Sequence, residues 1–153
     1  MPVRTLCFDG DPVLRGIAAP VLQFGADLDV LVTDLFATMY DSKGRGLAAP
    51  QVGVSLRVFV TDTDWKEAAP SPMAFVNPEI IATAPEQHCG PEACLSIPGR
   101  TFDVMRSVWV DLGWTSLAGL RQTARFHGVG AVCVCHELDH LNGILITESG
   151  TEI

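Results

Sequence analysis

Apolar positions recur every three or four residues in the first third of the chain, a period that predicts an amphipathic helix over Asp27–Tyr40. The apolar stripe consists of Leu28, Leu31, Leu35 and Met39. The glycine-rich residues 43–46 should end this helix. A second helix is predicted over Gly128–Leu141, and Asn142 and Gly143 are suitable residues to end it.

Between these helices, runs of β-branched and aromatic residues predict short strands. They fall at Arg57–Thr61, at Phe75–Val76 and Ile80–Ile81 on either side of an Asn-Pro turn, at Met105–Leu112 and at Gln122–Phe126. We therefore expect an α+β fold, with short antiparallel strands packed around the C-terminal helix and one N-terminal helix. A length of 153 residues suits a single catalytic domain over residues 1–153.

Charge and composition narrow the classes of partner. The net charge is −8 and the basic residues form no cluster, so we expect no direct contact with nucleic acid. No apolar run approaches the roughly 18 residues of a membrane span, and no signal peptide is expected. Five cysteines form no regular framework, which favours a reducing, cytoplasmic location.

The predicted C-terminal helix carries the most specific chemistry of the chain. His136 and His140 are four residues apart, about 40° around a helix axis, so both imidazoles can reach one metal ion. Glu137 lies beside the first histidine and can take a proton from a water at that metal. The pattern indicates a metal-dependent hydrolase, although a surface helix with solvated histidines could carry the same residues.

A catalytic site of this kind needs a third protein ligand. A histidine six residues after His140 is excluded because that position is Ile146. Only 13 residues follow His140, too few to bring Glu148 or Glu152 back on a packed helix. The third ligand should therefore come from upstream, and the absence of a downstream ligand argues against other metallopeptidase families.

Two upstream cysteines compete for the position of third ligand. Cys133 would lie near the same helix face as His136, although a small buried side chain is its simpler role. Cys94 lies in a short segment bounded by Pro91 and Pro98, which could present a thiolate and a backbone N–H together. From the residues alone, Cys94 is only modestly favoured.

Three separated motifs resemble those of the peptide deformylases. Residues 44–51 (GRGLAAPQ) resemble the family's glycine-hydrophobic-glycine-hydrophobic-Ala-Ala-x-Gln motif. Residues 92–96 (EACLS) resemble its Glu-Gly-Cys-Leu-Ser motif, and residues 136–140 (HELDH) resemble its third. The motifs occur in the family's order and spacing.

The resemblance implies a mononuclear site in which Cys94, His136 and His140 bind one divalent metal ion. The implied metal is Fe²⁺, with Zn²⁺ or Ni²⁺ also able to occupy the site, because one thiolate and two imidazoles suit all three ions. The implied reaction is hydrolysis of the N-formyl group of formyl-methionine at the start of newly made polypeptides, with release of formate. The implied partners are N-formylmethionyl peptides and nascent chains, and we expect a monomer or weak dimer.

The resemblance also implies roles for residues around the metal. Glu137 would be the general base, and the Gln51 side-chain amide and the Leu95 backbone N–H would stabilise the oxyanion. Asp139 would support a ligand or pair with Arg106. The substrate-binding positions would be Gly44, Arg45 and Gly46, where a peptide could join as an added strand, and Val129, Val132 and Cys133 around the methionine side chain.

Two departures from the family pattern leave an alternative open. Arg45 occupies a position that is usually apolar beside the substrate pocket, and Ala93 replaces a glycine. The alternative is a catalytically weak deformylase-like paralogue that binds N-terminal peptides with altered specificity.

Overall fold

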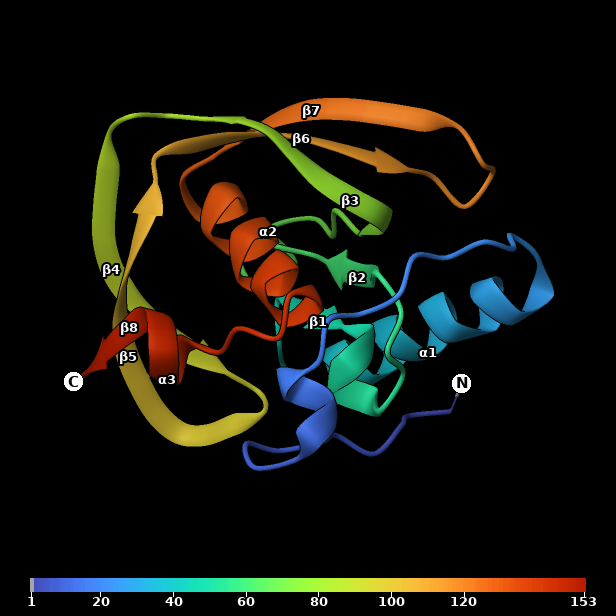
Figure 1. Cartoon of the computed structure of the whole chain (residues 1–153), viewed down its shortest axis with the longest axis horizontal. Helices are drawn as coiled ribbons and strands as arrows, with labels where there is room; N and C mark the ends of the chain where they lie inside the picture. The colour runs from blue at the N-terminus through green and yellow to red at the C-terminus, as the bar shows by residue number, and fades with distance from the viewer. Residues whose placement is uncertain (1) are drawn as a thin grey trace.

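The computed structural model describes residues 2–153, which form two antiparallel sheets with helix α2 (Gly128–Leu141) in contact with both (Figure 1). The larger sheet has the order β1-β2-β3-β6-β7, and the smaller has the order β4-β5-β8. The strands of the larger sheet are β1 (Gly46–Ala48), β2 (Val58–Thr61), β3 (Met73–Thr83), β6 (Trp109–Thr115) and β7 (Arg121–His127). Those of the smaller sheet are β4 (Gln87–Cys94), β5 (Ile97–Ser107) and β8 (Gly150–Glu152). The predicted α+β class is confirmed.

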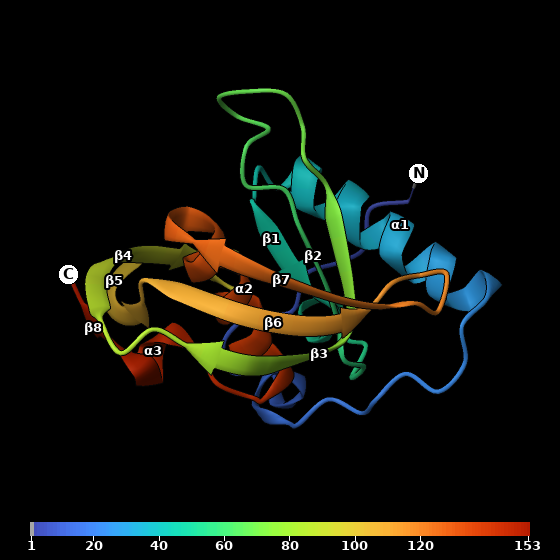
Figure 2. The ribbon, with the colours of Figure 1, turned by 90° about the horizontal axis from the view of Figure 1, so that it is seen from above.

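Helix α1 (Ala26–Asp41) confirms the first predicted helix to within one residue at each end. Its apolar stripe is buried, and it packs beside β1 and β2 as Figure 2 shows. Three one-turn helices complete the fold: η1 (Pro12–Arg15), η2 (Ala49–Val52) and α3 (Ile146–Ser149).

The predicted bounds of α2 are also confirmed, and the physical reason for its end is visible. Gly143 has a φ of +73°, a conformation that favours glycine. A Cβ there would also lie 2.5 Å from the Arg15 carbonyl oxygen, so the chain must pass closely against the N-terminal segment.

The strand predictions were wrong at several boundaries. Phe75–Val76 and Ile80–Ile81 belong to one 11-residue strand, β3, instead of two short strands. A register shift between Val76 and Glu79 accommodates Pro78, which cannot donate a ladder hydrogen bond, and Asn77 adopts a φ of +49°. The predicted strand Met105–Leu112 instead spans the end of β5 and the start of β6.

Two strands next to the site were not predicted at all. β4 is rich in polar residues, and β1 has only three residues, of which the first, Gly46, was expected to help end the preceding helix. Both acquire their structure from pairing with a partner strand, a tertiary effect that local propensity does not report. Within residues 2–153 we find no helix of the length and apolarity needed to cross a membrane.

Candidate metal centre

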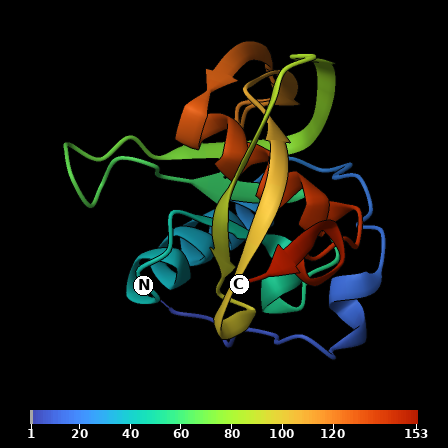
Figure 3. The same ribbon diagram turned by 90° about the vertical axis from the view of Figure 1, so that its left-hand side faces the viewer.

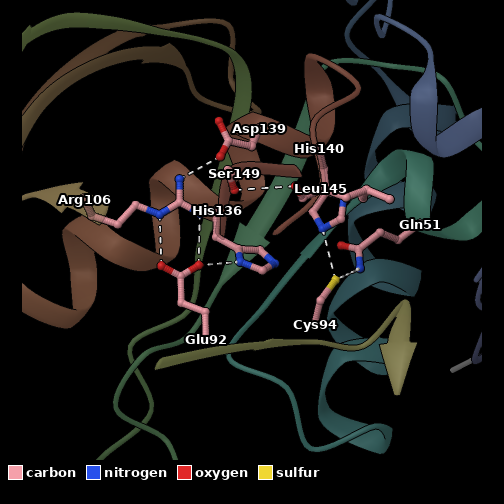
Figure 4. A network of polar contacts seen from close by, with 9 residues as sticks. All are labelled: Gln51, Glu92, Cys94, Arg106, His136, Asp139, His140, Leu145 and Ser149. Atoms are coloured by element: carbon pink, nitrogen blue, oxygen red, sulfur yellow. Dashed lines mark hydrogen bonds and ion pairs between the residues drawn. The ribbon is translucent and has the colours of Figure 1, made fainter. Parts of the chain in front are cut away.

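The end of β4 and one face of α2 bring three side chains together that suit a metal ion. The ligand atoms of Cys94, His136 and His140 all lie within 4.8 Å of one another. Cys94 Sγ is 3.3 Å from Nε2 of His140, and both residues are buried (Figure 4). One sulfur and two imidazole nitrogens form a donor set suited to divalent first-row metals.

Glu92 fixes the ring of His136. Its Oε1 lies 2.9 Å from Nδ1 of His136, which leaves Nε2 of that ring to face the site. Glu92 in turn accepts two hydrogen bonds of 2.9 Å from Arg106, and Arg106 donates a third, of 2.6 Å, to Asp139 (Figure 4). The predicted pairing of Asp139 with Arg106 is confirmed.

The orienting role of Glu92 was not predicted, although the sequence carried one signal for it. Glu92 and Cys94 are two residues apart, so on a strand both side chains project from one face. Because β4 was not predicted, this alternation was not used. Burial raises the pKa of Glu92, but its bonds with His136 and Arg106 outweigh that effect and hold the pKa below its ordinary value.

The electrostatics of the two histidines favour a cation between them and Cys94. Burial, reinforced by His136 and Arg106, lowers the pKa of His140 to about 3, so this imidazole is neutral, as a metal ligand must be. Burial also lowers the pKa of His136, but Cys94 and the carboxylates of Glu137 and Glu92 outweigh it and raise the pKa to about 10. The site therefore stabilises positive charge at His136, which a divalent ion can supply.

Glu137 lies on α2 beside the ligand group and is buried. Burial raises its pKa to about 7, with a further increase from Glu92 and an opposing decrease from His136. Its Oε1 has no hydrogen-bond partner among the described residues. A buried carboxylate needs a partner, so this oxygen is available to a ligand or a reacting water.

Gly46 on β1 makes room for Glu137. A Cβ at this position would lie 2.6 Å from Oε2 of Glu137 and 3.0 Å from Sγ of Cys133. The glycine therefore lets β1 approach the face of α2 that carries Glu137, where an alanine would push the carboxylate aside.

We predict that Gly46→Ala lowers kcat about 10²-fold while the protein stays folded, because displacement of the expected general base, Glu137, by about 1 Å would have a cost of this size. The measurement is steady-state turnover of a formyl-methionyl peptide, the substrate that the motif resemblance implies, together with the thermal midpoint. Gly90→Ala is the matched control, since its Cβ would meet nothing closer than 3.7 Å. Equal kcat values for Gly46→Ala and Gly90→Ala would contradict the role of Gly46 in making room for Glu137.

Gln51 lies in η2 and is buried, with 2% of its surface exposed. Its Oε1 accepts a hydrogen bond from the Ala48 N–H at 3.0 Å. This orients Nε2, which donates to Ser96 Oγ at 3.1 Å and lies 3.7 Å from Cys94 Sγ. Leu95 occupies the two-residue turn between β4 and β5, directly after Cys94. Both predicted oxyanion donors therefore lie next to the ligand group.

A pocket of about 460 Å³ opens onto the metal centre. Its lining includes His136, Glu137, Gln51 and Cys94, and all six predicted substrate-binding positions: Gly44, Arg45, Gly46, Val129, Val132 and Cys133. His140 is not among the lining residues and is almost fully buried. The pocket has the size and the apolar wall expected of a small-molecule or peptide site.

The structure distinguishes between the two cysteines that competed as third ligand. Cys133 is absent from the converging group, and its thiol lies 3.5 Å from the Arg45 carbonyl oxygen on the pocket wall. Burial raises the pKa of the Cys133 thiol well above its ordinary value, which disfavours the thiolate that metals bind. Glu148 pairs with Arg15 on the surface and takes no part in the site.

Comparisons with known proteins agree with this geometry. A family model described as polypeptide deformylase matches residues 3–152. The chain is 40% identical over 148 residues to a peptide deformylase of Mesorhizobium japonicum, covering 97% of this chain and 84% of that protein. It is 37% identical to the crystal structure of peptide deformylase from Thermotoga maritima, with a TM-score of 0.92 and 97% and 98% of the two chains covered. A class I type b peptide deformylase from Acinetobacter baumannii, crystallised with Met-Ala-Ser bound, is 35% identical with a TM-score of 0.91 and the same coverage.

Proposed function

This chain belongs to the polypeptide deformylase family, whose members are metal-dependent enzymes that remove formyl groups from nascent peptides, and we propose which of its residues carry out that reaction. The observation that carries the proposal is the convergence of Cys94, His136, His140 and Glu137 on one pocket. The interpretation as a weak paralogue has no support from the comparisons. Arg45 was the main departure that suggested this interpretation, and its positive charge is balanced by an ion pair with Glu67.

We propose that Cys94 Sγ and Nε2 of both histidines hold the metal, and that Fe²⁺ is the ion. When bound there, a divalent ion would supply Lewis acidity, lowering the pKa of a water and polarising the formyl oxygen. Glu92, Arg106 and Asp139 would keep His136 in the orientation that binding requires.

Glu137 is proposed as the general base and then the general acid. Its unpaired Oε1 accepts the proton of the attacking water and later returns it to the departing amine. A carboxyl group with a pKa near neutrality suits both transfers, because neither protonation state is strongly disfavoured at the working pH.

Gln51 and Leu95 are proposed as the donors to the oxyanion that forms when the formyl carbon is attacked. The amide of Gln51 is already held by Ala48 and Ser96, so it needs little reorganisation during the reaction. Donors of this kind commonly contribute about 10²–10³ in rate.

The substrate peptide is proposed to lie along the free edge of β1, which forms one end of the larger sheet. Peptides commonly bind such edges by strand addition, with backbone hydrogen bonds giving affinity. The methionine side chain would then contact Val129, Val132 and Cys133 in the pocket. The tripeptide in the Acinetobacter baumannii structure supports a peptide as the ligand.

Three remaining features are proposals that follow from this function. We propose that residues 1–153 act as one catalytic domain, that the enzyme works as a monomer or weak dimer, and that it acts in the cytoplasm, where nascent chains emerge.

The test is anaerobic loading with Fe²⁺ or Ni²⁺, followed by incubation with formyl-Met-Ala-Ser. We expect formate release from the loaded enzyme and its loss on chelation, because the ligand set requires an ion for activity. Unformylated Met-Ala-Ser is the negative control. A loaded, folded protein that releases no formate would refute the proposed function.

A further inference from the structure

The chain contains two lysines, Lys43 and Lys66, and both line the pocket described above. Lys43 directly precedes the Gly44–Gly46 segment, and Lys66 lies in the connection between β2 and β3, which projects from the fold in Figures 2 and 3. Both lysines are exposed, so their ammonium groups are accessible to a ligand at the pocket mouth. We call this pair the lysine rim.

The lysine rim differs from the other cations of the protein. Each of the eight arginines donates a hydrogen bond to a carboxylate or a backbone carbonyl within the chain. For Lys43 and Lys66, residues 2–153 provide no ion-pair partner within 4.0 Å, and the Lys66 ammonium lies 5.7 Å from the centre of the Trp65 ring. Within residues 2–153 of a protein of net charge −8, the two Lys or Arg side chains that form neither an ion pair nor a hydrogen bond thus share one pocket.

Hydrogen bonds hold the loop that carries Lys66 against the residues before β1. Arg45 donates to the Thr63 carbonyl at 2.6 Å and to both carboxylate oxygens of Glu67, the neighbour of Lys66. The indole of Trp65 donates to the Gly44 carbonyl at 2.9 Å. These contacts join the loop to the residues before β1, so Lys66 faces the same pocket as Lys43. They also give Arg45 a positioning role, with its charge balanced by Glu67.

The length of the chain limits how far Lys43 of the lysine rim can lie from Gly46, which is beside Glu137. Gly46 contacts Glu137, and Lys43 is three residues before Gly46. Lys43 lies in the turn before β1, and three residues of chain span at most about 11 Å, so the Lys43 backbone lies within about 11 Å of Gly46. A peptide extended along this edge covers the same distance in about three residues.

We propose that the lysine rim makes this enzyme select formyl-methionyl peptides with an acidic third residue. An Asp or Glu carboxylate at that position would pair with Lys43 and Lys66, neither of which forms an ion pair within residues 2–153. The inference rests on the proposed binding of the peptide along β1. An exposed ion pair contributes about threefold to affinity, so the two pairs with Lys43 and Lys66 should together raise the affinity for the acidic peptide about tenfold.

The test compares formyl-Met-Ala-Glu and formyl-Met-Ala-Gln, both with amidated C-termini so that the side chain carries the only carboxylate. We expect kcat/KM to be about tenfold higher for the Glu peptide, through KM, and the ratio to fall with added salt. Lys43→Gln with Lys66→Gln should bring the ratio close to one while turnover of the Gln peptide is retained. Moving the Glu to the second or fourth position should reduce the preference.

Arg121→Gln is the matched control, since it removes one positive charge from β7, outside the pocket lining. It should leave the ratio of Glu to Gln peptide unchanged. Equal kcat/KM for the two peptides in the wild-type enzyme, or a preference that survives the double lysine substitution, would overturn the inference. Turnover of the Gln peptide reports the deformylase function separately.

Discussion

Glu137→Gln is expected to lower kcat for formate release about 10³-fold while metal content and fold are unchanged. The reason is that the amide cannot accept the proton of the attacking water, and loss of general acid–base catalysis costs about 10²–10⁴ in rate. Glutamine has nearly the volume of glutamate and fits beside Gly46, so the pocket should keep its shape. The measurement is kcat and KM with formyl-Met-Ala-Ser, together with metal per chain.

A matched substitution separates this effect from a general loss of charge. Glu79→Gln removes a carboxylate that pairs with Arg121 on the exposed face of the large sheet, and it should leave kcat unchanged. A Glu137→Gln enzyme with wild-type kcat and full metal content would show that another group moves the proton.

Cys94→Ser is expected to lose the metal, whereas Cys133→Ser is expected to keep it. A serine hydroxyl is a poor substitute for a thiolate toward these ions, and removal of a ligand should cost more than the about 10–100-fold in affinity that loss of a supporting residue costs. Cys133 lies on the pocket wall with its thiol near the Arg45 carbonyl, away from the converging ligand atoms. Metal content after dialysis, measured for both variants, tests the assignment.

The two cysteine variants control for each other, since each exchanges one sulfur for oxygen in the same pocket. The Cys133→Ser protein should bind metal stoichiometrically and release formate, with any change confined to KM. Metal loss from Cys133→Ser together with retention by Cys94→Ser would reverse the ligand assignment.

Much of this protein could be inferred from local patterns. The stripe of α1 and the spacing of His136 and His140 are periodic signals within one helix, and helical geometry alone relates residues four apart. The position of Glu137 beside His136 is likewise a local feature of this helix. The motifs shared with a known family then supplied Cys94, Gln51 and Leu95, which no spacing connects to the histidines.

Tertiary structure decided which distant groups meet. Residues of β4 and α2 more than 40 positions apart meet within hydrogen-bonding distance, as in the 2.9 Å contact between Glu92 and His136. The strands β1 and β4 form because partner strands complete their hydrogen bonds, which local propensity does not encode.

The same distinction applies to Gly46, Arg45 and the lysine rim. By itself, the sequence determined the two long helices, the fold class and the candidate metal-binding residues of α2, because these depend on periodicity and residue type. Only the tertiary structure showed that Gly46 makes room for Glu137, that Arg45 binds Glu67, and that the two lysines share one pocket. These properties depend on the packing of segments distant in the chain, and that packing is set by the burial and pairing of the whole fold.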